Sequence, residues 1–156
     1  MITPGFWDWA LEAYGRDGVA DACVDLQDRH GQCVPLLLWA AWIASRDESA
    51  ADDTLEAACD IARAWDETTL DPLRALRRKL KSPHPDIEPG ARLDVRQKTI
   101  ELERRAEHHL MQALEHLPRE AAPGADTLKT LVAVTRAWSP VTPRKELQTL
   151  TACLSA

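Results

Sequence analysis

A basic run in the middle of the chain holds the side chains best suited to bind a charged group. Residues 74–81 include Arg74, Arg77, Arg78, Lys79 and Lys81, with no acid among them. Such a cluster can bind a phosphate or another small anion, and the same pattern is typical of a solvated helix face. The whole chain has a formal charge of −6, and no aromatic residue interleaves the run. The sequence therefore does not favour nucleic acid as a partner.

The helical stretch that follows carries charges that could pair with this run. In a heptad repeat the first and fourth positions face the partner helix and are normally apolar, but here three of them are charged. The residues at these positions are Leu93, Arg96, Ile100, Glu103, Glu107, Leu110, Leu114 and Leu117. Because buried charges persist only when paired, we expect Arg77 to pair with Glu103 or Glu107, with Arg74 and Arg96 as further partners. The network either fixes how two helices pack or lines a polar pocket for a small anionic ligand.

His30 is the one histidine placed for proton transfer. It ends an amphipathic stretch just before Gly31, close in sequence to Asp28 and Asp25, and an imidazole titrates near neutral pH. The alternative is a boundary histidine that interacts with a helix C-terminus. The chain has no Glu-x-x-His, His-Glu-x-x-His or Gly-x-Ser-x-Gly motif and no phosphate-binding glycine loop. The motif search thus leans against an enzyme and identifies no catalytic residue.

The sequence predicts neither a metal site nor a membrane segment. Successive cysteines lie 10, 26 and 94 residues apart, which is not the spacing of a zinc site. The longest apolar run, residues 34–44, falls short of the roughly 20 residues that cross a bilayer. The first residues lack the basic and apolar regions of a secretory signal. We therefore expect a cytoplasmic protein with reduced thiols, no metal and no cofactor.

The composition predicts an all-α fold that would position these residues. Leu and Ala together number 44, whereas Val and Ile number only 12, and helices draw on the first pair while sheets draw on the second. A chain of 156 residues can bury a sizeable core as one domain. We expect residues 1–156 to form a compact single-domain bundle of seven to eight helices, with a central apolar helix and one long helix.

Caps, prolines and periodicity predict where the helices lie. The central helix covers residues 35–44, is apolar on every side and buries Trp39 and Trp42. The long helix covers residues 91–117, about 40 Å at 1.5 Å per residue. It follows a loop over residues 82–90 that holds three prolines and is the best candidate for mobility. The other helices are expected over residues 4–14, 17–31, 53–65, 72–81 and 126–138, and from residue 142 onward.

Surface charge and one tryptophan indicate how the protein could contact a partner. Residues 1–66 hold 13 acids and 4 bases, whereas residues 67–156 hold 12 acids and 15 bases. The two parts can attract each other, or the basic part can bind an anion. Three acids, Asp21, Asp25 and Asp28, form a stripe whose charge is opposite to that of the basic run. Trp9 is the tryptophan best placed to anchor an interface.

These surfaces favour a non-enzymatic helical adaptor or regulatory protein that makes transient contacts with an unknown protein partner. The alternative is a protein that binds a small anionic ligand in a polar pocket between helices. An enzyme lacking a recognisable motif is the third possibility, with His30 and Asp28 as its proton carriers.

The N-terminal segment resembles the start of a known family. Residues 6–31 read FWDWALEAYGRDGVADACVDLQDRHG, and residues 36–42 read LLLWAAW. Further on, residues 72–81 read PLRALRRKLK, and Glu101 is followed by Leu102. These stretches are similar to a family of small bacterial all-helical proteins of unknown function. The resemblance implies an all-helical bacterial protein of the cytoplasm, and it supplies no catalytic residues.

Overall fold

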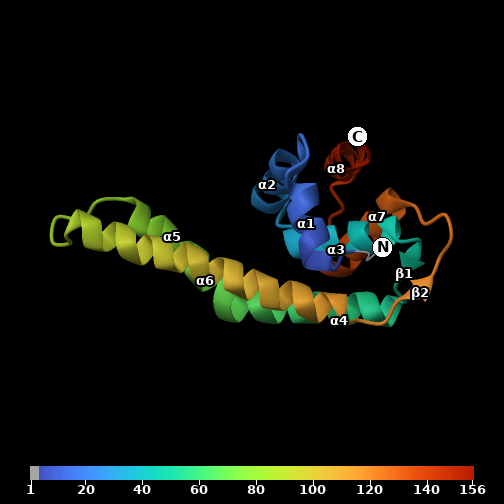
Figure 1. The fold of residues 1–156 in the computed structure, drawn as a ribbon, viewed down its shortest axis with the longest axis horizontal. Helices are drawn as coiled ribbons and strands as arrows, with labels where there is room; N and C mark the ends of the chain where they lie inside the picture. The colour runs from blue at the N-terminus through green and yellow to red at the C-terminus, as the bar shows by residue number, and fades with distance from the viewer. Residues whose placement is uncertain (1–3) are drawn as a thin grey trace.

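The computed structural model describes residues 4–156, which form a helical bundle with one very small sheet (Figure 1). A π-helical turn, η1 (Asp66–Leu70), joins two of the helices, and strands β1 (Glu48–Ser49) and β2 (Glu120–Ala121) pair antiparallel. The predicted all-α class is confirmed, and the eight α-helices within residues 4–156 match the predicted number. They are α1 (Phe6–Tyr14), α2 (Val19–His30), α3 (Val34–Ser45), α4 (Asp52–Trp65), α5 (Asp71–Lys81), α6 (Pro89–Glu115), α7 (Thr127–Trp138) and α8 (Arg144–Ser155).

Helix α3 lies at the centre because it is apolar on every side. Residues 35–44 are all buried, and α1, α6 and α7 pack against the helix. Trp39 is fully buried, and Trp42 stacks on Phe6 of α1 with 5.3 Å between ring centroids. The predicted central helix and the burial of both tryptophans are confirmed. The remaining four tryptophans, Trp9 among them, are half-buried and pack at the edge of the core.

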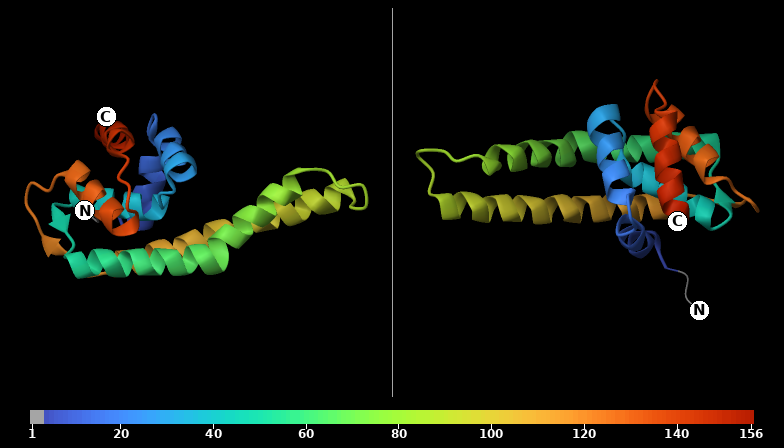
Figure 2. Two further views of the ribbon diagram at one scale, coloured as in Figure 1. Left: turned by 180° about the vertical axis from the view of Figure 1, so that it is seen from behind. Right: turned by 90° about the horizontal axis from the view of Figure 1, so that it is seen from above.

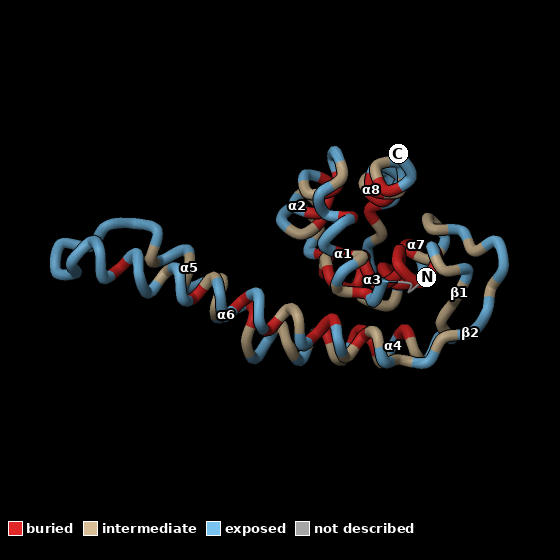
Figure 3. Tube along the Cα trace, in the orientation of Figure 1, coloured by how far each residue is buried: buried red, intermediate tan, exposed pale blue. Residues whose placement is uncertain are grey.

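A long helical hairpin projects from this core. Helices α4 and α5, joined by η1, run along one side of it, and α6 returns along the other (Figures 1 and 2). With 27 residues, α6 is about 40 Å long. The end of the hairpin extends beyond the other helices, and most of it is exposed (Figure 3). Because only two helices meet there, Leu76 and Leu93 are 41% and 51% exposed, although their periodicity predicts inward faces.

The expected break before residue 72 is wrong, because the chain stays helical from α4 through η1 into α5. Pro72 has no N–H to donate and its ring would clash with a carbonyl one turn back in a regular helix. The wider π-helical turn just before it accommodates this residue without ending the helix. The hydroxyl of Thr68 donates a hydrogen bond of 2.6 Å to the carbonyl of Ala64 in the same region. Proline therefore reshapes the helix here instead of stopping it.

Both predicted boundaries of the long helix α6 also change. Helix α6 begins at Pro89, so the connecting loop covers residues 82–88 rather than 82–90. The carboxylate of Glu88 accepts hydrogen bonds from the backbone N–H groups of Gly90 and Ala91, which caps the helix two residues earlier than expected. At its other end α6 stops at Glu115 rather than at residue 117.

The small sheet fastens the end of α3 to the chain that follows α6. Glu48 of β1 accepts hydrogen bonds from Arg46 and from Arg119, at 3.1 and 2.5 Å. Both guanidinium groups lie over the ring of Trp42, at 5.2 and 4.5 Å from its centroid. Burial alone would raise the pKa of Glu48, but the hydrogen bonds from Arg119 and Arg46 outweigh it and lower that pKa.

The last two helices complete the core much as expected. The carboxylate of Asp126 accepts a hydrogen bond from the N–H of Lys129, which confirms the predicted cap of α7. Helix α7 packs along α3, and α8 packs against α2 with Leu147, Leu150 and Leu154 buried. None of the helices within the described residues is both long enough and apolar enough to span a membrane.

Candidate functional site

A cleft of about 670 Å³ lies between the core and the hairpin. Helices α1, α2 and α3 form one wall, and α5 and α6 form the other. Its lining comprises Trp7, Ala10, Leu11, Tyr14, Val24, Gln27, Val34, Pro35, Leu38, Arg74, Arg77, Glu103, Arg104, Glu107 and Met111. Four of the six charged residues that we singled out as binding candidates therefore meet in one place: Arg74, Arg77, Glu103 and Glu107.

The wall from the core is largely apolar. Leu11 and Val24 are 58% and 48% exposed, so they present hydrocarbon surface to the cleft instead of filling the core. Trp7 stacks on His108 of α6 with 4.2 Å between ring centroids. The backbone N–H of Phe6 donates a hydrogen bond of 2.7 Å to the carboxylate of Glu115, where a negative charge at the N-terminus of α1 is favourable. These two contacts hold α1 against α6 and fix the spacing of the two walls.

An ion pair between Arg77 and Glu103 crosses the charged wall. Nε of Arg77 donates a hydrogen bond of 2.7 Å to Oε1 of Glu103, which confirms the predicted pairing across two helices. The side chain of Glu103 is only 11% exposed, so its charge depends on this partner. Within residues 4–156, the terminal nitrogens of Arg77 donate no hydrogen bond. Arg77 therefore retains donors for a ligand while one of its nitrogens is held.

Arg74 lies among three carboxylates at the junction of η1 and α5. Its guanidinium nitrogens are 3.7 Å from Asp66, 3.4 Å from Asp71 and 3.8 Å from Glu107. Burial raises the pKa of both Asp66 and Glu107, and the charge of Arg74 partly opposes this rise. Arg74 is thus mainly committed to its own acidic neighbours.

Arg104 is the one charged residue of the cleft lining that the sequence did not indicate. It makes no hydrogen bond or ion pair with any residue of the described chain. The heptad pattern draws attention to Glu103 and Glu107, and Arg104 lies beside that seam. Its position three residues before Glu107 places the two on one side of α6, which is the only signal that could have indicated it.

Other candidate residues lie away from the cleft. Arg78 and Lys81 are exposed on α5 and do not line it. Trp9 is half-buried and packs against the core. Arg96 has a buried Nε without a hydrogen-bond partner and makes no ion pair within residues 4–156, so the expected network does not extend to it.

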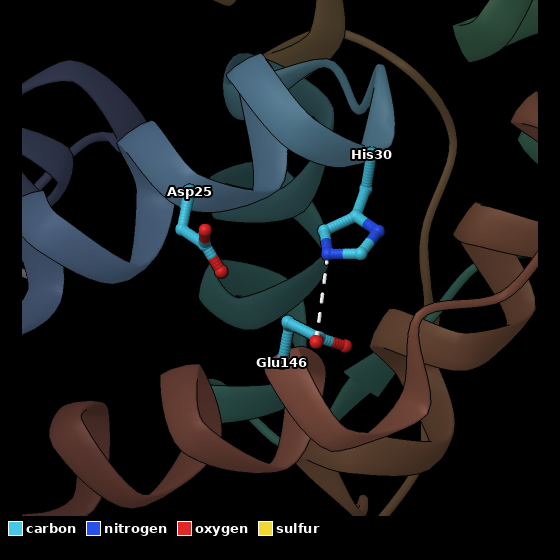
Figure 4. Close-up of side chains that lie close together, drawn as sticks. All are labelled: Asp25, His30 and Glu146. Carbon is cyan, nitrogen blue, oxygen red and sulfur yellow. Dashed lines mark ion pairs between the residues drawn. The ribbon is translucent and has the colours of Figure 1, made fainter.

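His30 does not meet Asp28, which is exposed. Its Nε2 instead lies 3.5 Å from Oε1 of Glu146 on α8, with Asp25 close to both (Figure 4). The geometry therefore gives no support to a proton relay between His30 and Asp28. Glu146 had no signal in the sequence, because it is 116 positions from His30.

The four cysteines are free thiols, and three of them are buried. Burial raises the pKa of Cys23 to about 12 and that of Cys59 to about 11, and it raises the pKa of Cys33 still further. Because the thiolate is the nucleophile, these three side chains are unsuited to nucleophilic catalysis near neutral pH.

Comparison with known proteins identifies a family for this chain. A family model with the description "Protein of unknown function (DUF2390)" matches residues 5–114. No curated protein and no solved structure gives a significant match. The matched segment runs from α1 to the end of α6 and contains every residue that lines the cleft. Because the match covers more than half of the chain, the protein belongs to the DUF2390 family.

Proposed function

We propose that the protein binds a small monoanionic ligand with an apolar body in the cleft between the core and the hairpin. The observation that carries this proposal is the meeting of unpaired guanidinium donors, on Arg77 and Arg104, with an exposed apolar wall in one cleft. A volume of about 670 Å³ lies within the range of roughly 300–1,000 Å³ that is usual for small-molecule sites.

The charge of the lining favours a carboxylate over a dianionic phosphate. Three arginines and two glutamates line the cleft, which leaves an excess of one positive charge. A guanidinium binds a carboxylate through two parallel hydrogen bonds. A second negative charge on the ligand would meet Glu103 and Glu107 with no further cation to balance it.

The apolar wall of the cleft determines the chemistry of the uncharged part of the ligand. Trp7, Leu11 and Val24 belong to helices that face α5 and α6 across the cleft, so a bound acid would direct its hydrocarbon or aromatic part toward them. Burying that surface supplies binding free energy at roughly 25 cal/mol per Å², and the arginines supply orientation. Medium-chain or aromatic carboxylic acids fit both walls.

The test uses the intact protein and two neighbouring arginines. Small molecules extracted from protein purified out of its own cells are identified by mass spectrometry. Octanoate, octanol and inorganic phosphate are then titrated while the intrinsic tryptophan fluorescence is followed, to which Trp7 in the cleft contributes. We expect octanoate to bind and Arg104→Gln to weaken it about tenfold, which corresponds to about 1.4 kcal/mol. The matched control is Arg105→Gln, because Arg105 is also exposed on α6 but lies outside the cleft. Equal affinities in the two variants, or octanol binding as tightly as octanoate, would overturn the proposal.

We also propose, as a second function, an adaptor that contacts a protein partner through the hairpin tip. The distal half of the hairpin carries the cations Arg78 and Lys81, which make no ion pair within the described chain. It also exposes four large apolar side chains, Leu76, Ile87, Leu93 and Val95. A partner with acidic residues around an apolar patch fits this surface. The free thiols support the further proposal that the protein works in the bacterial cytoplasm.

Charge reversal tests the adaptor function. Arg78→Glu combined with Lys81→Glu should abolish co-purification of such a partner, because neither side chain makes an ion pair within the described chain. The control pair is Lys129→Glu with Arg144→Glu, two exposed residues on α7 and α8. Co-purification lost equally in both pairs, or in neither, would contradict a role for the hairpin tip.

A further inference from the structure

We propose that Asp25, His30 and Glu146 bind a zinc ion between α2 and α8. One ligand atom from each side chain lies within 4.8 Å of the other two, and all three side chains are half-buried. They come from two helices and point into the same gap (Figure 4). This cluster is separate from the cleft, and nothing in the proposed binding of a carboxylic acid uses it.

The distance between His30 and Glu146 suits a shared metal ion better than a hydrogen bond. Bonds from zinc to nitrogen or oxygen measure about 2.0–2.2 Å, so two ligand atoms on a tetrahedral zinc ion lie about 3.4 Å apart. The observed separation of Nε2 and Oε1 is 3.5 Å. A hydrogen bond would be about 2.7–3.2 Å, and two neighbouring ligands of an octahedral ion would lie about 3.0 Å apart.

Asp25 needs only a small movement to complete the set. Its carboxylate is 3.1 Å from Nε of Arg29, whose side chain is 79% exposed. An ion pair with so exposed an arginine contributes little to stability, so Asp25 can turn toward His30 and Glu146 at small cost. Two carboxylates and one neutral imidazole then balance the charge of the ion and leave one coordination position for water.

The backbone around His30 is already fixed. Nε2 of Gln32 donates a hydrogen bond of 3.1 Å to the His30 carbonyl, and the indole N–H of Trp138 donates one of 2.9 Å to the Gly31 carbonyl. Gly31 has a left-handed backbone with φ of 60°, which ends α2 directly after His30. These contacts hold the His30 backbone above α8, so only the side-chain torsions of the imidazole remain to be set when it binds a metal ion.

Such an ion would fasten α8 to the part of the chain that matches the family. Asp25 and His30 lie within residues 5–114, whereas Glu146 lies beyond them. Ligand spacing along the sequence could not reveal the site, because local motifs join residues only a few positions apart. This particular set of three ligands would therefore come together only in the folded chain.

The experiment measures zinc binding to the whole protein by titration against a fluorescent chelator, and thermal unfolding with zinc and with EDTA. We expect one zinc ion per chain, a higher Tm with zinc, and the visible absorption of tetrahedral Co²⁺ when cobalt is substituted. His30→Gln and Glu146→Gln should each weaken zinc binding at least tenfold. Asp28→Asn is the control, since Asp28 is an exposed acid of the same helix, and it should bind zinc like the original protein.

A gain of affinity provides the second arm of the test. Arg29→Gln removes the competing partner of Asp25 and should tighten zinc binding several-fold without altering the circular dichroism of the metal-free protein. The proposal is overturned if Glu146→Gln and Asp28→Asn bind zinc equally, if Arg29→Gln leaves the affinity unchanged, or if zinc does not bind stoichiometrically.

Discussion

The Arg77–Glu103 pair shows how one contact can serve both stability and binding. Glu103 is buried and takes its hydrogen bond from Nε, which leaves the outer nitrogens of Arg77 in the cleft. The neighbouring Arg104 has no partner in the described chain and adds a second donor. The structural and the functional interpretations of this network are therefore compatible, since different nitrogens of one guanidinium would perform the two tasks.

Removing one partner of this pair should destabilise the protein, and removing both should restore much of the loss. Arg77→Leu leaves a buried carboxylate unpaired and should cost about 1–3 kcal/mol, less than a fully buried pair would because Arg77 is partly exposed. Arg77→Leu with Glu103→Leu removes that unpaired charge. Urea unfolding of both single variants and the double variant measures the coupling. Additive losses would show that the two side chains do not stabilise each other.

Glu107 should make the protein more stable as the pH falls from about 7 toward its ordinary pKa of 4.5. Burial raises the pKa of Glu107, so the folded protein holds this proton to a higher pH than the unfolded chain does. The stability that comes with the proton is present at low pH and is lost as the pH rises through the raised pKa.

Glu107→Gln carries no such proton and should show a smaller change in unfolding free energy between about pH 5 and about pH 7. Burial also raises the pKa of Asp66, so the unfolding free energy of the variant should still depend partly on pH. An identical pH dependence in the two proteins would mean that folding does not alter the titration of Glu107.

At the level of single residues, the sequence predicts contacts between neighbouring helices but not between distant ones. Arg77 and Glu103 were identifiable because each charge interrupts an apolar face, and buried charges must find partners. Arg104 is exposed and Glu146 is half-buried, and charged side chains are common at such positions. Their roles depend on which helices meet, and that information is absent from local periodicity.

At the level of elements, Arg92 holds the hairpin tip together. Its guanidinium donates hydrogen bonds of 2.6 and 3.2 Å to the carbonyls of Leu80 and Lys81, which are the last of α5. A cation at the C-terminus of a helix also interacts favourably with the helix dipole. The tip has few apolar contacts, so this cap supplies much of its local order.

Arg92→Met should therefore increase local opening at the end of the hairpin without unfolding the core. We expect faster amide hydrogen exchange at the end of α5, equivalent to a local loss of about 1 kcal/mol, with little change in the overall Tm. Lys98→Met, an exposed substitution on the same helix, is the control. Slower or unchanged exchange in the Arg92 variant would contradict the capping role.

Helix positions were predictable where caps and prolines act locally, as at Asp126 and at Gly31. The expected break before Pro72 is wrong because the surrounding helix tolerates proline by widening into η1. The sheet of β1 and β2 had no signal at all. Each strand has two residues, and their pairing depends on contacts between residues 48 and 121 that no local pattern encodes.

At the level of the whole molecule, the two parts of opposite charge are not held together mainly by ion pairs. Of the ion pairs within residues 4–156, those that join residues 1–66 to the rest are Arg74 with Asp66, Arg119 with Glu48, and His30 with Glu146. The packing of α3 against α6 and α7 joins the two parts instead. The predicted charge asymmetry is thus mostly left on the surface.

A cut at the hairpin tip should leave the fold intact. Lys81 and residues 82–88 are exposed, and trypsin can cleave after Lys81. The two fragments share the core through α3, α6 and α7, so we expect them to elute as one species in size-exclusion chromatography with nearly the original helix content. Separation of the fragments without denaturant would show that the hairpin connection is required for the assembly of the core.

The covering of α3 by α7 also determines when during synthesis the core can be completed. Ninety-three positions separate Ser45, the end of α3, from Trp138, the end of α7. At about 5–20 residues per second, a ribosome takes roughly 5–20 seconds to translate that interval. For that time the most apolar segment of the nascent chain lacks the helix that covers it. The core is therefore closed only when the final turns of α7 are synthesised, long after α3.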